Sequence, residues 1–373
     1  MTVFAAMTLA GCGSRPTVKW ESQKYNAPKS PVIKVYMENS GSMDGYMCPG
    51  SELKDAVYSY VSALNVKADT TELNYINTQV VPCRLPLQAF VRDLTPATLH
   101  GTGGDTSHSE ISDMLQMILG RMNDHTLSVF ISDCIIDVPQ GDAANYLNLR
   151  QTDITNAITT YLKAHKDMGV EVMHMESKFD GMLYGPQGAR RYNGTRPYYI
   201  IIMGSRHQLA MMNKAVPQSD IQHGVKHYCA FASAMDVPFE LTNTFGMSSP
   251  RNQIDLNSAR DGAFTLKANA DLAYTLQSDD YLADPKHYDI DSESLTVDKV
   301  EKGKDPYTHT LTLGLAKGFR PSKICVAVKL ESQPQWLGEA DTQTTGIRQI
   351  VTGIAHAFAD KSSGQIAFTV VKR

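Results

Sequence analysis

The sequence predicts an α/β protein in which a doubly wound, mostly parallel sheet is followed by a smaller C-terminal antiparallel β domain. Two observations lead to this prediction. In the first 216 residues, short runs that are apolar on both faces alternate with segments of helical periodicity, which is typical of a parallel sheet covered on both sides. After residue 217 the helical stripes give way to short runs of alternating apolar and polar residues, which is typical of antiparallel strands.

The elements of the first part follow from these patterns. Six short apolar runs are expected to be strands, at residues 32–37, 71–81, 87–94, 126–133, 170–175 and 196–204. Four segments with apolar residues at helical spacing are expected to be helices, at residues 51–64, 107–122, 152–169 and 205–216. Between the last two strands, the polar segment 177–197 is interpreted as a solvated loop, with a recognition surface as the alternative.

The C-terminal part is expected to contain strands at residues 263–276, 309–318, 323–332 and 364–373, with one or two inserted helices, one of them at 344–360. The expected division of the chain is 1–12 as a signal segment, 13–30 as a tether, 31–216 as the α/β domain, 217–262 as a connection and 263–373 as the β domain.

Composition excludes some functions. The 373 residues carry a formal net charge of -4 and the isoelectric point is about 6.3, which argues against nucleic-acid binding driven by bulk charge. No apolar run reaches the 18 residues that a membrane-spanning helix needs. The cysteines after Cys12 show no CxxC spacing, which argues against a zinc ribbon; a bridge between Cys48 and Cys83 is left open.

The N-terminal run "TVFAAMTLAGC" resembles a bacterial lipobox, in which Cys12 would be lipidated. A polar, proline-containing stretch follows it, as expected for a tether to a membrane. No Lys or Arg precedes Arg15, although signal peptides begin with a positive region. The resemblance implies a lipid-anchored protein of the bacterial cell envelope; the alternative is an N-terminus that is disordered or packs in a core.

Oxygen-bearing side chains follow the predicted strands at the edge where the strands end. Glu38, Ser40 and Ser42 come directly after the first strand, Thr106 lies in the glycine-rich loop "GTGGDTSHSE" before a helix, and Asp133 ends the strand "VFISD". In open α/β sheets, ligands bind outside the carboxyl ends of the strands. Two carboxylates and three hydroxyls are suited to a hard divalent cation such as Mg²⁺ or Mn²⁺.

These three loops resemble the metal-ion-dependent adhesion site of the von Willebrand factor A domain. The family pattern is Asp-x-Ser-x-Ser, then a Thr after Gly-Gly, then an Asp, and this chain has Glu38-x-Ser40-x-Ser42, Gly103-Gly104-Asp105-Thr106 and Asp133. The resemblance covers residues 31–216. It implies a Rossmann-like sheet and a non-enzymatic, protein-binding module, in which a carboxylate of the partner protein completes the coordination of the metal.

One position departs from the family pattern, because Glu38 stands where the family has Asp. The extra methylene moves the carboxylate outward, which matters for a cation with strict octahedral geometry. Two alternatives therefore remain: a metal-dependent phosphoesterase or other hydrolase using Asp105 and His108, and a structural envelope subunit in which the metal site is vestigial. Taken one at a time, each of these loops is also typical of an ordinary turn or helix cap.

Overall fold

Seven strands form the larger sheet among the described residues. The computed structural model describes residues 16–107, 110–139, 141–184, 188–247, 251–256, 263–331, 333–358 and 360–372. Their order across the sheet is β4-β3-β2-β5-β7-β6-β8. Their bounds are β2 Val32–Glu38, β3 Thr70–Ile76, β4 Val80–Cys83, β5 Thr126–Ser132, β6 Met168–Leu183, β7 Arg190–Ser205 and β8 His227–Ala232.

The prediction of a doubly wound, mostly parallel sheet is wrong. The β2–β3 and β2–β5 pairs are parallel, whereas the other four neighbouring pairs are antiparallel. The reason lies in residues 177–197, which continue β6 and β7 as a two-stranded ribbon paired from Met168–Ser205 to Leu183–Arg190. The connection that remains between the two strands is too short for a crossover helix, so β7 must return antiparallel to β6.

Helices cover both faces of this sheet. α1 (Glu52–Asn65) and α5 (Arg206–Ala215) pack on the face that carries Ile33 and Val35. α3 (Ile111–Leu119), α4 (Ala143–Ala164) and α8 (Ile347–Ala357) pack on the opposite face. Residues 87–94, expected to be a strand, instead contain a helical turn at Gln88–Arg92.

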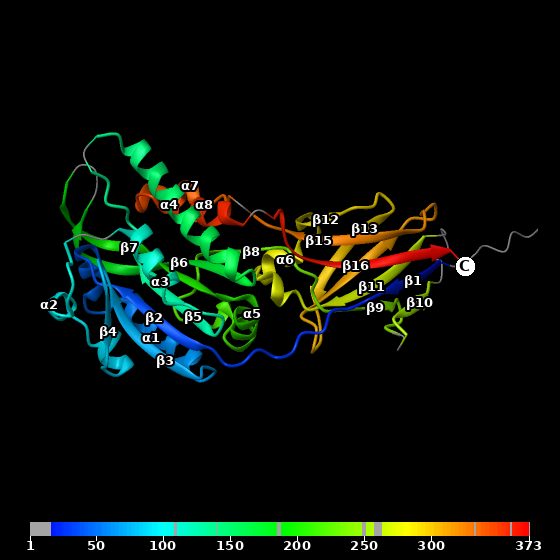
Figure 1. Ribbon diagram of the computed structural model, residues 1–373, viewed down its shortest axis with the longest axis horizontal. Coiled ribbons are helices and arrows are strands. Elements are labelled where there is room, and N and C mark those ends of the chain that lie inside the picture. The colour runs from blue at the N-terminus through cyan, green and yellow to red at the C-terminus, as the bar shows by residue number, and fades with distance from the viewer. Residues whose placement is uncertain are drawn as a thin grey trace, which may run out of the picture.

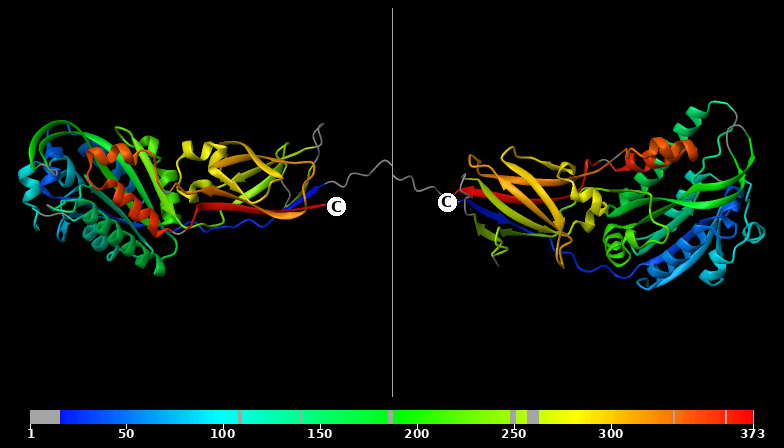
Figure 2. Two further views of the ribbon diagram at one scale, coloured as in Figure 1. Left: turned by 90° about the horizontal axis from the view of Figure 1, so that it is seen from above. Right: turned by 180° about the vertical axis from the view of Figure 1, so that it is seen from behind.

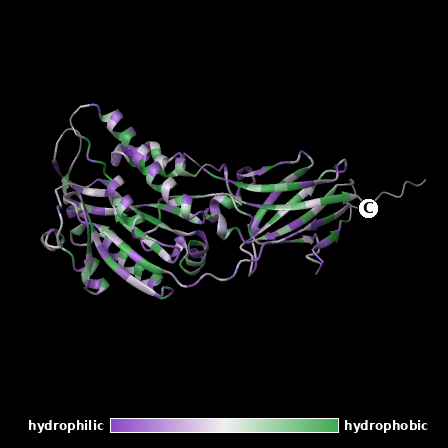
Figure 3. Cartoon of the chain, viewed as in Figure 1, coloured by the Kyte–Doolittle hydropathy of each residue, from purple (hydrophilic) through white to green (hydrophobic). Residues whose placement is uncertain are grey.

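The second part of the molecule is a sandwich of two antiparallel sheets, in the orders β10-β1-β16-β15-β12 and β13-β14-β11-β9. Their bounds are β1 Pro16–Trp20, β9 Phe239–Asn243, β10 Gln253–Asp255, β11 Phe264–Ala270, β12 Tyr288–Ile290, β13 Leu295–Lys302, β14 His309–Leu315, β15 Ser322–Lys329 and β16 Ser362–Lys372. Apolar and polar residues alternate along these strands (Figure 3), and the inward set forms a core of its own.

The chain crosses between the two parts more often than the expected domain division allows. Residues 16–20, placed in the tether, form β1 and pair with both β16 and β10 in the sandwich. α7 (Leu337–Gln343) and α8 come between two sandwich strands in sequence, yet they lie on the α/β part (Figures 1 and 2). Gly353 lets α8 approach α4 closely, because a Cβ at this position would lie 2.8 Å from the Gln151 carbonyl oxygen.

The α/β part and the sandwich are joined end to end, so the molecule is elongated (Figure 1). Within the described residues, no helix has both the length and the apolar character needed to cross a membrane.

Candidate functional site

The candidate site lies where two neighbouring parallel strands end. β3 and β5 flank β2 on either side, so the chain order reverses between β2 and β5. Such a reversal leaves a crevice outside the carboxyl ends of the two strands. Met37 pairs with Ile131, which brings Glu38 on β2 beside Ser132 on β5. The three parallel strands β3, β2 and β5 therefore keep the reversal of chain order that positions the site, although the sheet as a whole is mixed.

Glu38 links the two strand ends. Its carboxylate is fully buried and accepts hydrogen bonds from Ser40 Oγ at 2.5 Å and from Ser132 Oγ. The Ser132 hydroxyl accepts in turn from the backbone N–H of Cys134 at 2.7 Å. The longer side chain at position 38 is therefore held by two hydroxyls rather than extended into solvent.

Asp133 follows directly and is also fully buried. Its Oδ1 accepts a hydrogen bond from the Ile135 N–H at 3.3 Å. Burial raises the pKa of Asp133, while the Arg196 guanidinium, the Ile135 N–H and the Ser42 hydroxyl act in the opposite direction. Its Oδ2 has no hydrogen-bond partner among the described residues. A buried acceptor without a donor is costly, and a bound cation or its water would satisfy it.

The second loop reaches the same place through backbone contacts. The Gly41 N–H donates to the Thr106 carbonyl at 3.0 Å, which ties the first loop to the second. Gly103 and Gly104 have φ values of 111° and 80°, in the region that favours glycine. A Cβ on Gly104 would lie 2.2 Å from Asn77 Oδ1, so this position also requires the smallest side chain.

The hydroxyl-bearing residues Ser40, Ser42 and Thr106 line one cavity of about 360 Å³. Ser40 and Ser42 have their Oγ atoms 3.0 Å apart. Ile135, Ile136 and Val138 contribute apolar lining, Asp137 contributes a carboxyl group, and Thr345 of the α7–α8 turn also lines the cavity. Of the five predicted ligands, Ser40, Ser42 and Thr106 line the cavity, and Glu38 and Asp133 are buried. Glu38 accepts a hydrogen bond from Ser40, and the Ser42 hydroxyl acts to lower the pKa of Asp133.

Arg196 is the residue of this site that the sequence interpretation missed. It lies on β7, is buried, and places Nη1 3.9 Å from Asp133 Oδ2. Its guanidinium lies over the Phe179 ring, 4.9 Å from the centroid, and Nη2 donates to the Gln343 carbonyl. The sequence interpretation places residues 177–197 in a solvated loop, and an arginine in such a loop is expected to be exposed. The signal was present in "TRPYYIIIMG", where Arg196 directly precedes an apolar strand.

The donor set fits a hard divalent cation. Hydroxyl and carboxylate oxygens are the ligand types that Mg²⁺ and Mn²⁺ prefer. Within the described ranges, no three His, Cys, Asp or Glu side chains gather as a metal-binding group, so a site built from such residues alone is not found there. Ser40, Ser42 and Thr106, with Glu38 and Asp133 behind them, are the residues that would hold the ion.

Other polar side chains near these loops, among them Asp105, Asp44 and His100, make contacts of their own. Asp105 accepts hydrogen bonds from the Ser107 N–H and Oγ, and so shapes its own loop. Asp44 Oδ2 lies 2.7 Å from His100 Nε2, and His100 Nδ1 lies 3.1 Å from Thr106 Oγ1. Cys48 and Cys83 are not bonded to each other. Cys12 and His108 lie outside the described residues.

No known protein-family model matches this sequence, and a search of curated proteins found no match.

Proposed function

We propose that this chain is a membrane-anchored binding protein of the bacterial envelope, rather than an enzyme. In this proposal its pocket works like the metal-ion-dependent adhesion site of von Willebrand factor A domains: it holds Mg²⁺ or Mn²⁺ and takes up a carboxylate of a partner protein. The observation that carries the proposal is the convergence of three hydroxyl residues, Ser40, Ser42 and Thr106, on one cavity backed by two buried carboxylates.

The site carries an excess of acidic groups. When ionised, Glu38, Asp133 and the cavity-lining Asp137 contribute three negative charges, and Arg196 contributes one positive charge. The apo site is then net negative and attracts a divalent cation. The bound ion offsets this charge, and an open coordination position on it would accept an oxygen ligand such as a carboxylate.

The test is calorimetric titration of Mg²⁺ and Mn²⁺ into the chelator-treated full chain, comparing it with the Ser40→Ala/Ser42→Ala variant. Saturable binding that this variant loses is the expected result, because two candidate ligands are removed. Ser292→Ala/Ser294→Ala is the matched control, since these two serines are also two residues apart but lie in the sandwich. Equal cation binding by both variants, or none by the unsubstituted chain, would refute the metal site.

A further inference from the structure

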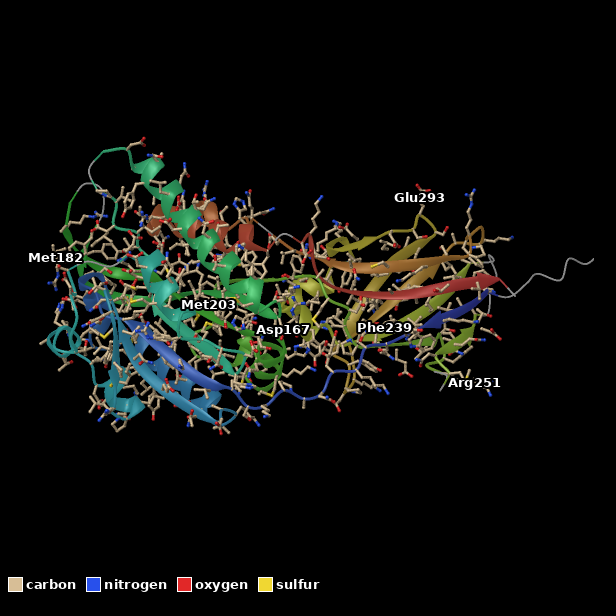
Figure 4. All side chains as sticks on the ribbon, in the orientation of Figure 1. Asp167, Met182, Met203, Phe239, Arg251 and Glu293 are labelled. Atoms are coloured by element: carbon tan, nitrogen blue, oxygen red, sulfur yellow. The ribbon has the colours of Figure 1, made fainter. Side chains whose placement is uncertain are left out.

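Several chain ends and turns meet at the end of the sandwich farthest from the candidate site. β1 starts there, because Pro16 pairs with Lys372 near the end of β16. β9 and β14 run in the same direction, since each is antiparallel to β11, so the turn after Asn243 and the connection 316–321 lie at this end too. The labelled residues Met182 and Arg251 mark the two opposite ends of the molecule (Figure 4).

The turn after β9 holds two large apolar side chains in solvent. Phe245 is 77% exposed and Met247 is 59% exposed. This conformation is fixed by Asn243, whose Oδ1 accepts from the N–H groups of both residues at 3.0 Å, and whose own N–H donates to the Met247 carbonyl at 3.2 Å. A turn braced in this way keeps its apolar side chains outward, at a cost that a binding partner can offset.

The position of β1 shortens the tether. Residues 13–30 were expected to separate the lipidated cysteine from the fold, but Pro16 and Thr17 are already paired with β16. Cys12 precedes Pro16 by four residues, and four fully extended residues span at most about 14 Å. If Cys12 carries the lipid, as the proposed function assumes, this end of the sandwich is held within that distance of the bilayer.

We infer that this end of the sandwich docks on the lipid bilayer, with Phe245 and Met247 inserted at the interface between headgroups and acyl chains. Phe is among the apolar side chains that interfacial segments bury at the boundary of headgroups and acyl chains, and Met is apolar and flexible. The exposed cationic residues Arg251, Lys317 and Arg320 lie on turns of this end, where anionic headgroups attract positive charge. The exposed Glu293 lies there too, because the Ala316 N–H donates to the Ser294 carbonyl, so the apolar pair rather than net charge carries the docking. The cation pocket then faces away from the membrane, toward partners outside the bilayer surface.

The experiment places a tryptophan at position 245 and measures its depth. Full-length Phe245→Trp protein is isolated with its anchor and reconstituted into vesicles of phosphatidylethanolamine and phosphatidylglycerol whose acyl chains are brominated. Tryptophan fluorescence is compared with that in unbrominated vesicles, after subtracting the signal of the unsubstituted chain, which contains Trp20 and Trp336. Val66→Trp is the matched control, because Val66 is 76% exposed but follows α1 in the α/β part.

The expected result is at least twofold stronger quenching of the introduced tryptophan in the Phe245→Trp protein than in the Val66→Trp protein. Equal quenching of the two in anchored protein would overturn the docking inference while leaving the anchor intact. Labelled palmitate, supplied during growth, tests the anchor separately and should label the chain but not a Cys12→Ser variant. If no label is incorporated, the anchor is refuted. The docking inference is then tested with Cys12→Ser/Phe245→Trp protein mixed with the same vesicles. Quenching of its tryptophan supports the docking surface, and no quenching overturns it.

Discussion

Replacing Arg196 by Met should destabilise the metal-free protein, because Arg196 compensates a buried carboxylate. Its Nη1 lies 3.9 Å from Asp133 Oδ2, and both side chains are buried. At this separation, and with an effective dielectric constant of about 20, the attraction is about 4 kcal/mol. Removing one partner of a buried pair typically costs about 3–5 kcal/mol, because the other charge is left without compensation. Met retains the packing volume against Phe179, so the change acts mainly on charge.

The loss should depend on pH in a defined direction. Burial already raises the pKa of Asp133, and removal of Arg196 raises it further. The folded state then binds a proton that the unfolded state has released, so stability falls as pH rises above the unfolded pKa of about 3.9. Below that pH the carboxyl is protonated in both states, and the variant should approach the stability of the unsubstituted chain.

A divalent cation should reverse part of this loss if it occupies the site next to Asp133. Saturation at 100 times the dissociation constant stabilises a protein by about 2.7 kcal/mol. The variant lacks the positive charge of Arg196, which repels a cation beside Asp133, so the same Mn²⁺ concentration should stabilise the variant more than the unsubstituted chain. Urea unfolding at pH 7.5, with EDTA and with Mn²⁺, measures both effects.

Arg191→Met is the control, because Arg191 lies on the same strand but is exposed and pairs with Asp180 at the surface. Exposed pairs contribute about 0–1 kcal/mol, so this variant should unfold close to the unsubstituted chain. The reasoning is refuted if Arg196→Met loses no more than Arg191→Met in EDTA. It also fails if Mn²⁺ stabilises Arg196→Met no more than the unsubstituted chain.

Two further predictions concern the second loop and a buried acid away from the site. Gly104→Ala should lower cation affinity at least tenfold and destabilise the fold by more than about 1 kcal/mol, because the new side chain has a strained positive φ and collides with Asn77. Gly101→Ala is the control, because the nearest atom to its Cβ would be 3.5 Å away. This control should leave both the cation affinity measured by calorimetry and the stability measured by urea unfolding nearly unchanged. Glu171 is fully buried, and burial raises its pKa to about 7, so the folded state binds its proton more tightly than the unfolded state. The free energy of unfolding should therefore fall by about 3 kcal/mol between pH 4.5 and pH 7.5. The Glu171→Gln variant should not show this fall when its urea midpoints are measured across the same pH range. Identical pH profiles for the two proteins would contradict the raised pKa of Glu171.

Local sequence patterns located the ends of β2 and β5 better than they predicted the directions of the strands in the sheet. Strand ends are local features, so Glu38 after β2 and Asp133 after β5 could be placed from apolar runs that stop at polar residues. The helix expected at 107–122 is present as Ile111–Leu119, within the usual error of helix ends. Strand direction is not local, because a buried run reads the same in parallel and antiparallel pairs.

The missed features share a second cause, which is that they depend on contacts between distant segments. β1 is five residues long and becomes a strand by pairing with β16, about 350 residues later in sequence. The amphipathic pattern of α8 predicted a helix, but nothing in the pattern says that Ile347 and Ile350 pack on the α/β part rather than on the sandwich. Arg196 was missed for the same reason, since its partner Asp133 follows β5, far from Arg196 in sequence.

These long-range contacts bear directly on how the candidate site is held. The cavity wall includes Thr345, and the Ile136 N–H donates to the Thr345 carbonyl at 2.9 Å, so the α7–α8 turn supports the segment that follows Asp133. Gln343 in α7 accepts a hydrogen bond from Arg196, which in turn lies beside the Asp133 carboxylate. α7 and α8 are connected in sequence to β15 and β16 of the sandwich. The geometry of Asp133 therefore depends on a segment whose two ends are fixed in the other part of the molecule. A fragment ending near residue 216 would lack this support, because α7 and α8 would be missing from it.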